Sequence, residues 1–311
     1  MQQVPMKKNK SPKNTTVNIE ALLHNMKEIS SGAYSKVYRA ELTDRVKNQK
    51  GSTITTIALK IAIAEEDREC LFNEANIYLK IAKGCKHHPE YQLAQACITD
   101  FYGFREDTIR GTLYIEFANN GSLYDLLHEN NIKLKCKTYY PMMREIMTGI
   151  DLLHKLGIYH RDLKPSNILL NEGHCKLADF GLSIEKNMIK PFAAPIGSRL
   201  YRAPELLRDY NPSLHKEKAD IYAAGLIFWE MATGIVPYEN DEDKIRNEHI
   251  LVKRVGHGGH RPNISNKIPK KVAHLIRWFW HQDENTRAFA DQALEELNKK
   301  NMKVSARIAK F

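Results

Sequence analysis

Short hydrophobic runs with the character of β-strands dominate roughly the first 115 residues. They predict strands over 26–30, 36–42, 53–63, 96–104 and 112–117, with the polar run 45–52 as a hairpin loop. One segment differs, because residues 65–82 place Leu71, Ala75, Tyr78 and Ile81 at helical spacing. The first part of the chain is therefore expected to be a sheet with one helix.

The pattern changes after the turn signal Asn119-Asn120-Gly121. Ser122 is expected to cap a short helix that runs through Leu127. Further helices are predicted over 138–156, 220–233, 271–281 and 289–298. A β-rich lobe at 21–117 followed by a helical lobe at 118–298 makes an α+β, two-lobe architecture.

The charge of the chain is concentrated at its ends. The net charge is +10, of which residues 1–19 carry +4 and residues 299–311 carry +5, without an acid in either stretch. Residues 1–20 and 299–311 are therefore predicted to be basic, disordered tails. The tails suit contact with an acidic partner or an anionic membrane surface. The lobes between them are nearly neutral and hold no readout motif for nucleic acid, so no specific nucleic acid is expected.

Composition excludes several classes of protein. The 311 residues are 42% hydrophobic and 27% charged, which is typical of a globular chain with a real core. The longest apolar run, 221–229, is too short to span a membrane, and the start of the chain lacks the apolar stretch of a secretory signal. Five scattered cysteines form no C-x-x-C pair, which favours reduced thiols and a cytoplasmic location.

An ordered set of motifs carries the chemistry. The segment 160–167 reads HRDLKPSN, and Asp-Phe-Gly at 179–181 and Ala-Pro-Glu at 203–205 follow it. Upstream, Lys60 ends the β-branched strand and Glu74 lies fourteen residues later on the predicted helix. In this order the motifs resemble the eukaryotic protein kinase family over residues 25–297. The resemblance implies the two-lobe protein kinase fold.

The resemblance also implies catalytic roles. Lys60 would hold the α- and β-phosphates of ATP, and Glu74 would pair with Lys60 to fix its place. Asp162 would accept or orient the proton of the substrate hydroxyl. Lys164 resembles the lysine that serine/threonine kinases direct at the γ-phosphate. Asn167 and Asp179 would supply the oxygen ligands of Mg²⁺.

Other positions resemble an ATP site. The stretch from Ile29 to Val37 aligns with G-x-G-x-x-G-x-V, but only Gly32 remains of its three glycines. The remaining resemblances are apolar side chains that would sandwich the adenine ring (Val37, Ala58, Leu169) and residues whose backbone would bind it (Glu116, Ala118).

Scaffold positions complete the resemblance. Asp220 is similar to the buried aspartate that anchors the catalytic loop, and Arg287 is similar to the arginine that pairs with Glu205. The segments 116–127, 258–264 and 275–280 are similar to the tyrosine-kinase-like group. The segment 184–197 contains no Ser, Thr or Tyr, so activity is not expected to depend on phosphorylation there. Glu185 is its only acid; a solvated side chain is the favoured interpretation, and a weak substitute partner for Arg161 is the alternative.

These features favour an ATP- and Mg²⁺-dependent serine/threonine kinase that acts on protein substrates in intracellular signalling. The alternative is a nucleotide-binding pseudokinase scaffold, which only the reduced glycine loop favours. A small-molecule kinase of related fold is disfavoured, because the residues from Ser198 to Glu205 resemble those of peptide-binding kinases.

Overall fold

The computed structural model describes residues 19–47, 51, 53–106, 111–186, 188, 197–208, 217–239 and 247–299. These residues divide into two compact units. Residues up to Asn76 and Asp100–Phe117 form the first unit, and Ile77–Thr99 with the chain from Ala118 onward form the second. The sequence predicts that all of 21–117 belong to one lobe. In the structure, residues 77–99 belong to the second unit instead.

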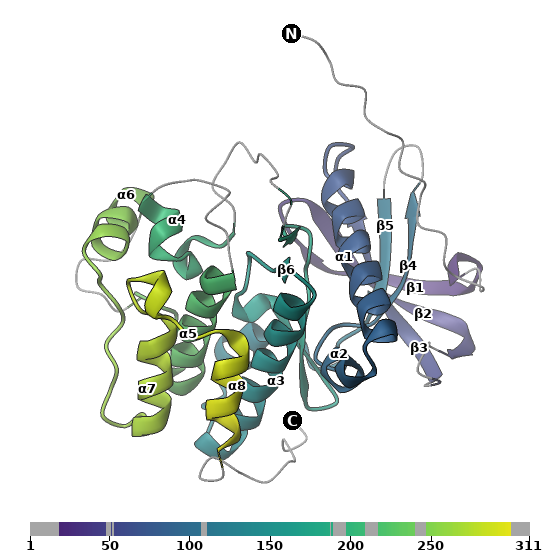
Figure 1. Ribbon diagram of the computed structural model, residues 1–311. Coiled ribbons are helices and arrows are strands. Elements are labelled where there is room, and N and C mark those ends of the chain that lie inside the picture. The colour runs from purple at the N-terminus through teal and green to yellow at the C-terminus, as the bar shows by residue number, and fades with distance from the viewer. Residues whose placement is uncertain are drawn as a thin grey trace. The chain divides into compact units, whose positions relative to one another are not determined.

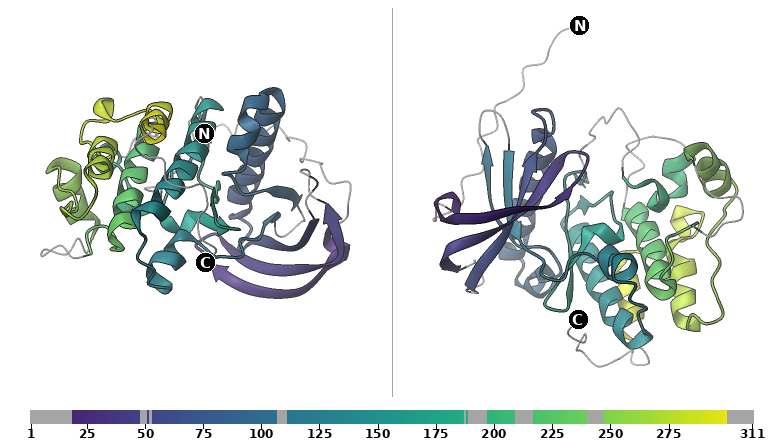
Figure 2. Two further views of the ribbon diagram at one scale, coloured as in Figure 1. Left: turned by 90° about the horizontal axis from the view of Figure 1, so that it is seen from below. Right: turned by 180° about the vertical axis from the view of Figure 1, so that it is seen from behind.

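The first unit is built on one antiparallel sheet, with strand order β1-β2-β3-β5-β4 (Figures 1 and 2). Its strands are β1 (Leu23–Ser31), β2 (Ser35–Lys47), β3 (Thr53–Ala62), β4 (Phe101–Glu106) and β5 (Gly111–Glu116). The strand β2 is longer than predicted, because Val46 pairs with Ile54 beyond a register shift after Glu41. Part of the expected loop 45–52 is therefore strand.

A short 3₁₀ helix, η1 (Ile19–Leu22), packs on this sheet. Ile19 is buried in a cluster with Leu42 and Tyr114. The Tyr114 hydroxyl donates to Glu20, which also pairs with Arg105. Ile19 and Glu20 therefore belong to the folded domain, although the sequence assigns them to the tail. The rest of that tail, 1–18, lies outside the described residues.

The predicted helix over 65–82 is α1 (Arg68–His87). Its predicted apolar stripe, represented by Leu71 and Ile81, is buried. The expected strand over 96–104 begins only at Phe101. Residues 96–99 follow a short helix instead, and Thr99 N–H donates to the carbonyl of Leu177, the last residue of strand β8 (His174–Leu177). This bond lies in the second unit, so the strand-like run 96–104 is divided between the two units.

The second unit is mainly helical, as predicted. Its elements are η2 (Pro89–Tyr91), α2 (Gln92–Gln95), η3 (Asp125–Glu129), α3 (Cys136–Lys155), β6 (Ile158–Tyr159), η4 (Pro165–Asn167), β7 (Ile168–Asn171), β8 (His174–Leu177), β9 (Ile184–Glu185), η5 (Arg199–Tyr201), α4 (Pro204–Arg208), α5 (Glu217–Thr233), α6 (Glu248–Leu251), η7 (Val252–His257), α7 (Lys270–Phe279), η8 (Glu284–Thr286) and α8 (Ala290–Asn298).

Helix α5 forms the centre of this unit, packed against α3 and α7 (Figure 1). Its central stretch, 221–229, is buried and apolar on all sides, as expected of a helix that lies inside the core. Ser122 caps the short helix as predicted, accepting a hydrogen bond from Asp125 N–H at 3.2 Å. None of the helices in the described part of the chain is long and apolar enough to cross a membrane.

Candidate active site

In the first unit, Lys60 and Glu74 form a buried ion pair. Lys60 Nζ lies 2.7 Å from Glu74 Oε2, and the Glu74 side chain has no exposed surface. Lys60 is held by the sheet, since it pairs with Val37 of β2 and Leu113 of β5. The sequence prediction that these two residues pair is therefore confirmed.

The loop between β1 and β2 contains Gly32, whose N–H donates to the carbonyl of Ser35 at 2.8 Å. A Cβ built on Gly32 would lie 3.6 Å from that oxygen, an ordinary van der Waals contact. The chain's own packing therefore leaves room for a side chain. Because packing within the chain does not require glycine at this position, the glycine is better explained by a phosphate that approaches the backbone of the loop closely.

The other first-unit residues of the predicted ATP site lie on the same strands. Ala58 of β3 is paired with Ile115 of β5, and Ile29 of β1 is 46% exposed. Glu116 has a role inside the unit, because its N–H donates to the carbonyl of Asp100 and its carboxylate accepts from Asp100 N–H at 3.0 Å.

In the second unit, Asp162 is the centre of a polar network. Its Oδ2 lies 2.8 Å from Lys164 Nζ and accepts from Asn167 Nδ2 at 3.1 Å. Its Oδ1 accepts from Ser198 N–H at 2.7 Å. Asn167 Nδ2 also donates to the carbonyl of Asp162 at 2.8 Å. The structure thus brings together three of the predicted residues and fixes the carboxylate in one orientation.

Asp220 anchors the loop that carries Asp162, as predicted. Its Oδ2 accepts from His160 N–H at 2.8 Å and its Oδ1 from Arg161 N–H at 2.9 Å. Burial acts to raise the pKa of Asp220, but hydrogen bonding from His154 and the loop outweighs it and lowers the pKa. Asp220 is therefore an ionised anchor at neutral pH. The sequence analysis missed His154, which lies 3.0 Å from Asp220 Oδ2.

Asp179 lies beside this network. The preceding residue, Ala178, donates its N–H to the carbonyl of Asn167 at 3.0 Å. Asp179 has a φ of 65° and Arg161 a φ of 72°, an uncommon conformation for residues with a side chain. Such a strained backbone is kept only where surrounding contacts hold it in place, and it is frequent at functional sites. The next side chain, Phe180, is buried and packs edge-on against Tyr78.

The two second-unit residues expected near adenine, Ala118 and Leu169, are connected through one turn. Ala118 opens this turn, and its carbonyl accepts from Gly121 N–H at 3.3 Å. The next residue, Ser122, forms a β-bridge with Leu169 of β7. The fold therefore brings β7 to the end of the turn that Ala118 begins.

The segment before α4 approaches the catalytic loop through Gly197. This residue has a φ of 81°, and a Cβ on it would lie 2.5 Å from the carbonyl oxygen of Arg161. Only glycine fits so close to another backbone in this conformation. Ser198 contacts Asp162 through its backbone N–H.

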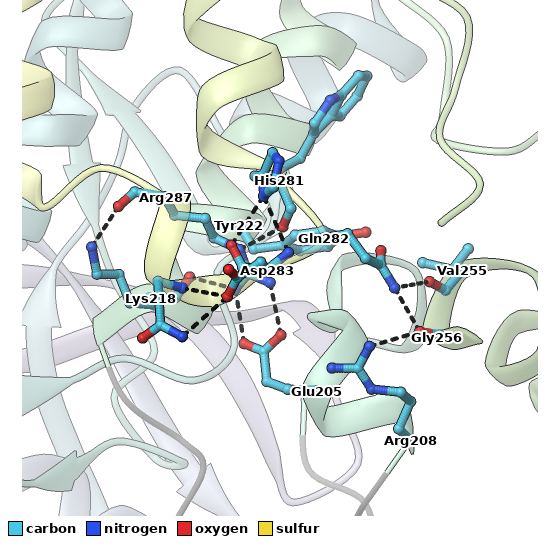
Figure 3. Close-up of polar contacts among 12 residues, drawn as sticks. Glu205, Arg208, Lys218, Tyr222, Val255, Gly256, His281, Gln282, Asp283 and Arg287 are labelled. Carbon is cyan, nitrogen blue, oxygen red and sulfur yellow. Dashed lines mark hydrogen bonds and ion pairs between the residues drawn. The ribbon is translucent and has the colours of Figure 1, made fainter. Parts of the chain in front are cut away.

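Glu205 and Arg287 form the predicted scaffold pair (Figure 3). Two hydrogen bonds of 2.8 and 2.7 Å join the guanidinium to the carboxylate. Arg287 also donates to the carbonyls of His281 and Lys218. Arg287 is only 2% exposed, so its donors are satisfied inside the protein.

Two polar contacts differ from or go beyond the sequence expectations. Glu185 pairs with Lys80 at 2.6 Å, so it is neither the unpaired, solvated side chain that the sequence favoured nor the alternative partner of Arg161. Glu230 binds both Tyr201 and His128. Glu230 directly follows the apolar run 221–229 of α5, and this position was the signal in the sequence for the buried group.

The residues present fit Mg²⁺ and ATP. Both hydrogen bonds of the Asn167 amide use Nδ2, and its oxygen is the atom that can ligate a cation. With the Asp179 carboxylate it offers two hard oxygen ligands, and Mg²⁺ commonly takes one or two protein ligands together with phosphates and water. Lys60 supplies a positive charge for phosphate and Gly32 a loop without a side chain.

Comparisons with known proteins agree with this geometry. Residues 23–297 match the family model described as protein kinase domain. The chain is 38% identical over 186 residues to a probable serine/threonine-protein kinase of Dictyostelium discoideum, covering 59% of this chain and 19% of that protein. It is 28% identical to serine/threonine-protein kinase STY46 of Arabidopsis thaliana, covering 87% of this chain and 43% of that protein.

A third relative is the dual specificity protein kinase pyk3 of Dictyostelium discoideum, 30% identical over 76% of this chain and 17% of that protein. The chain thus spans less than half the length of each of these relatives. The match to the family model covers most of the chain and includes every motif that contributes to the polar network around Asp162. The chain therefore belongs to the eukaryotic-type protein kinase family.

Proposed function

We propose that the chain transfers the γ-phosphate of Mg-ATP to serine or threonine hydroxyls of protein substrates, in intracellular signalling. The observation that carries the proposal is the fixed orientation of Asp162, with Lys164, Asn167 and the Ser198 N–H as its partners. Phosphoryl transfer depends mainly on such positioning and on neutralisation of charge.

The chain's residues divide the work. Asp162 receives or orients the proton of the substrate hydroxyl. The oxygen of that hydroxyl forms a bond to the γ-phosphorus of ATP, while the bond between the γ-phosphorus and the bridging oxygen breaks and ADP leaves. Lys164, held 2.8 Å from Asp162, supplies positive charge beside the reacting oxygens. Bound Mg²⁺, ligated by Asn167 and Asp179, would neutralise phosphate charge.

A small, partly open hollow lies beside Asp162, and Ser198, Tyr201, Ala203 and Leu206 are among its lining residues. The proposed protein substrate rests on the family to which the chain belongs. The serine/threonine choice is supported by Lys164 and by the names of two of the relatives above.

A pseudokinase scaffold is the weaker candidate. The network of Asp162 with Lys164, Asn167 and Ser198 is complete, and a scaffold that only binds nucleotide would not need it. The tails remain proposed contacts for an acidic partner or membrane surface. They lie outside the described residues except Ile19, Glu20 and Lys299, which pairs with Glu296.

The test is a transfer assay with labelled ATP, Mg²⁺ and a degenerate peptide library, followed by identification of the modified residues. We expect phosphoserine and phosphothreonine. Asp162→Asn keeps the size of the side chain and should lower kcat by orders of magnitude with ATP binding retained. ATP binding without transfer by the wild type would establish the scaffold instead, and phosphotyrosine alone would refute the substrate class.

A further inference from the structure

Helix α7 (Lys270–Phe279) carries its apolar and its charged side chains on opposite faces (Figure 1). The apolar side chains are buried, and the ring of Phe279 packs against Phe228 of α5 with 5.7 Å between the ring centres. The other buried positions are Val272, Ala273, Leu275 and Ile276. Because this face is already used in the core, only the opposite face is available to a partner.

The opposite face is positively charged. Together with the turn before α7 it consists of six residues, which we name the basic face: Lys267, Lys270, Lys271, His274, Arg277 and Trp278. Steps of three or four residues, from Lys270 to His274 and on to Arg277, place these side chains on one side of the helix. All six are exposed except Trp278, which is half-buried.

The lysine and arginine side chains of the basic face have no ion pair among the described residues. Cations on other surfaces are paired, as Lys36 is with Glu28 at 3.0 Å and Lys155 is with Asp151 at 2.7 Å. No described carboxylate therefore neutralises the basic face, and its charge is available to anions from outside the chain.

The basic face belongs to a long stretch of sequence without acids. Residues 249–282 contain seven lysines and arginines and neither aspartate nor glutamate, so they carry +7. The chain between the two tails has a net charge of +1, so the rest of it, 20–248 and 283–298, carries −6. An anionic surface therefore attracts the side of the chain that carries α7 and repels the remainder.

Trp278 adds an aromatic ring to this face. Its indole N–H donates to the carbonyl of Thr286 at 3.0 Å, and its ring centre lies 6.5 Å from that of His274. The ring is thus held at the surface, whereas Trp229 and Trp280 are buried in the core. Tryptophan beside lysine and arginine is typical of residues at the interface between a membrane and water.

We propose that the basic face of α7 binds the surface of a membrane that contains anionic lipids. Three of its four cations are lysines, whose compact charges suit electrostatic attraction better than the paired hydrogen bonds that arginine makes with one phosphate or carboxylate. The face is the outside of a single helix, so it can meet a flat array of headgroups. Single-stranded nucleic acid is bound instead in a charged groove that follows its backbone.

The contact is peripheral, because the apolar face of α7 stays in the core and only charged and aromatic groups reach the lipid. It does not rest on the proposed function, since it uses neither ATP nor Asp162. Binding to lipid and transfer of phosphate can therefore be measured separately, and either can fail without the other.

The test is binding of the full chain to vesicles of phosphatidylcholine with or without phosphatidylserine, measured by co-sedimentation in the absence of ATP. The α7 variant combines Lys270→Gln, Lys271→Gln and Arg277→Gln. Each cation close to an anionic surface strengthens binding about fivefold, so the loss of three should weaken binding about a hundredfold. Binding by the wild type should require phosphatidylserine and should decline as salt screens the charges.

The matched control combines Lys133→Gln, Lys135→Gln and Lys137→Gln, before and at the start of α3. These three lysines are also exposed and without an ion pair among the residues that the structure describes. The control removes the same net charge and leaves the basic face intact, so binding should stay within about threefold of the wild type. An equal loss in the two variants would show attraction by net charge alone and overturn the proposal.

Other outcomes would overturn it as well. Undiminished binding by the α7 variant would assign the contact to the basic tails, which that variant keeps. If the α7 variant lost binding to a single-stranded oligonucleotide but not to the vesicles, the face would be a nucleic-acid surface instead. Absence of binding between the wild type and phosphatidylserine vesicles would refute the proposal directly.

Two further measurements complete the test. Thermal unfolding should be unchanged in the α7 variant, whose three replaced side chains are exposed. If that variant does not fold, Lys267→Gln with Lys271→Gln decides, with an expected loss of about 25-fold. Brominated phosphatidylserine should quench tryptophan fluorescence in the wild type but not in Trp278→Phe, because Trp229 and Trp280 are buried. Equal quenching in the two proteins would show that another face contacts the lipid.

Discussion

The guanidinium of Arg287 and the carboxylate of Glu205 lie 82 residues apart in sequence and share two hydrogen bonds in the interior of the second unit. Their surroundings are shown in Figure 3, where the Arg287 side chain also reaches carbonyls of neighbouring segments. The pair thus ties the start of α4 to the segment before α8.

Removing Arg287 should strongly destabilise the fold. Arg287→Met leaves the buried Glu205 carboxylate without its partner, and breaking a buried pair in this way costs about 3–5 kcal/mol. Denaturant unfolding measures the loss. Lys155→Met is the control, because Lys155 pairs with Asp151 one helical turn away on a partly exposed surface and should cost less than about 1 kcal/mol. Similar losses in the two variants would contradict this view of the pair.

A methyl group at position 197 should impair catalysis. In Gly197→Ala the Cβ meets the Arg161 carbonyl, and the left-handed backbone adds about 1–2 kcal/mol of strain. The segment must shift, so Ser198 N–H moves relative to Asp162 and kcat should fall at least about tenfold. Gly234→Ala is the control, since its φ is 68° but no atom lies within 4 Å of its Cβ. Gly234→Ala should have the same backbone strain as Gly197→Ala but keep the kcat of the wild type.

The glycine at position 32 should matter for ATP rather than for folding. The chain leaves room for a Cβ there, so Gly32→Ala should change the free energy of unfolding by less than about 1 kcal/mol. KM for ATP should rise about tenfold, because the added methyl group lies where the backbone approaches phosphate. KM for peptide serves as the internal comparison. A large loss of stability with unchanged KM for ATP would assign this glycine a structural role.

Stability should depend on pH through Glu230. Its pKa is about 7 in the folded chain against 4.5 for an ordinary glutamate, so the folded state binds more protons between these values. This contribution to stability is present below pH 4.5 and is lost as the pH rises through 7. Relative to Glu230→Gln, the wild type should therefore lose stability over this window, by about 3 kcal/mol in full. The same pH dependence of the free energy of unfolding in the wild type and in Glu230→Gln would contradict this prediction.

The kinase should not require phosphorylation within 184–197, which offers no hydroxyl. The start of this segment is fixed by the pair between Glu185 and Lys80, a contact that needs no phosphate. Phosphatase treatment should therefore leave the transfer rate unchanged, with mass spectrometry confirming that Ser183, Ser198 and Tyr201 are unmodified. If phosphatase treatment greatly lowered the transfer rate, and phosphorylation of Ser183, Ser198 or Tyr201 restored it, the segment would be a phosphorylation switch.

The proximity of Asp162, Lys164 and Asn167 could be predicted from the sequence because their motif is local. Asp162, Lys164 and Asn167 lie within six residues of one another, so one short segment contains most of their network. The scaffold pairs of Asp220 and Arg287 were predicted only through the family resemblance, since their partners lie far away in the chain.

The errors have physical reasons. Residues 96–99 have strand-like composition, but their bonds go to β8 rather than to β4 and β5. The pair between Glu185 and Lys80 was not predicted, because charge alone does not specify which of several lysines and arginines lies within reach. The Glu230 cluster joins three elements, and no local pattern reports such a meeting.

The bonds from Asp220 also bear on how the chain folds. They reach about sixty residues back to the loop at His160 and Arg161, where the left-handed backbone of Arg161 is unfavourable without them. We therefore expect the loop to adopt this shape only once α5 has docked in the second unit. Hydrogen exchange at these two amides should report cooperative opening of that unit rather than local fluctuation. Partly folded forms of the chain would accordingly lack activity, however much helix they retain.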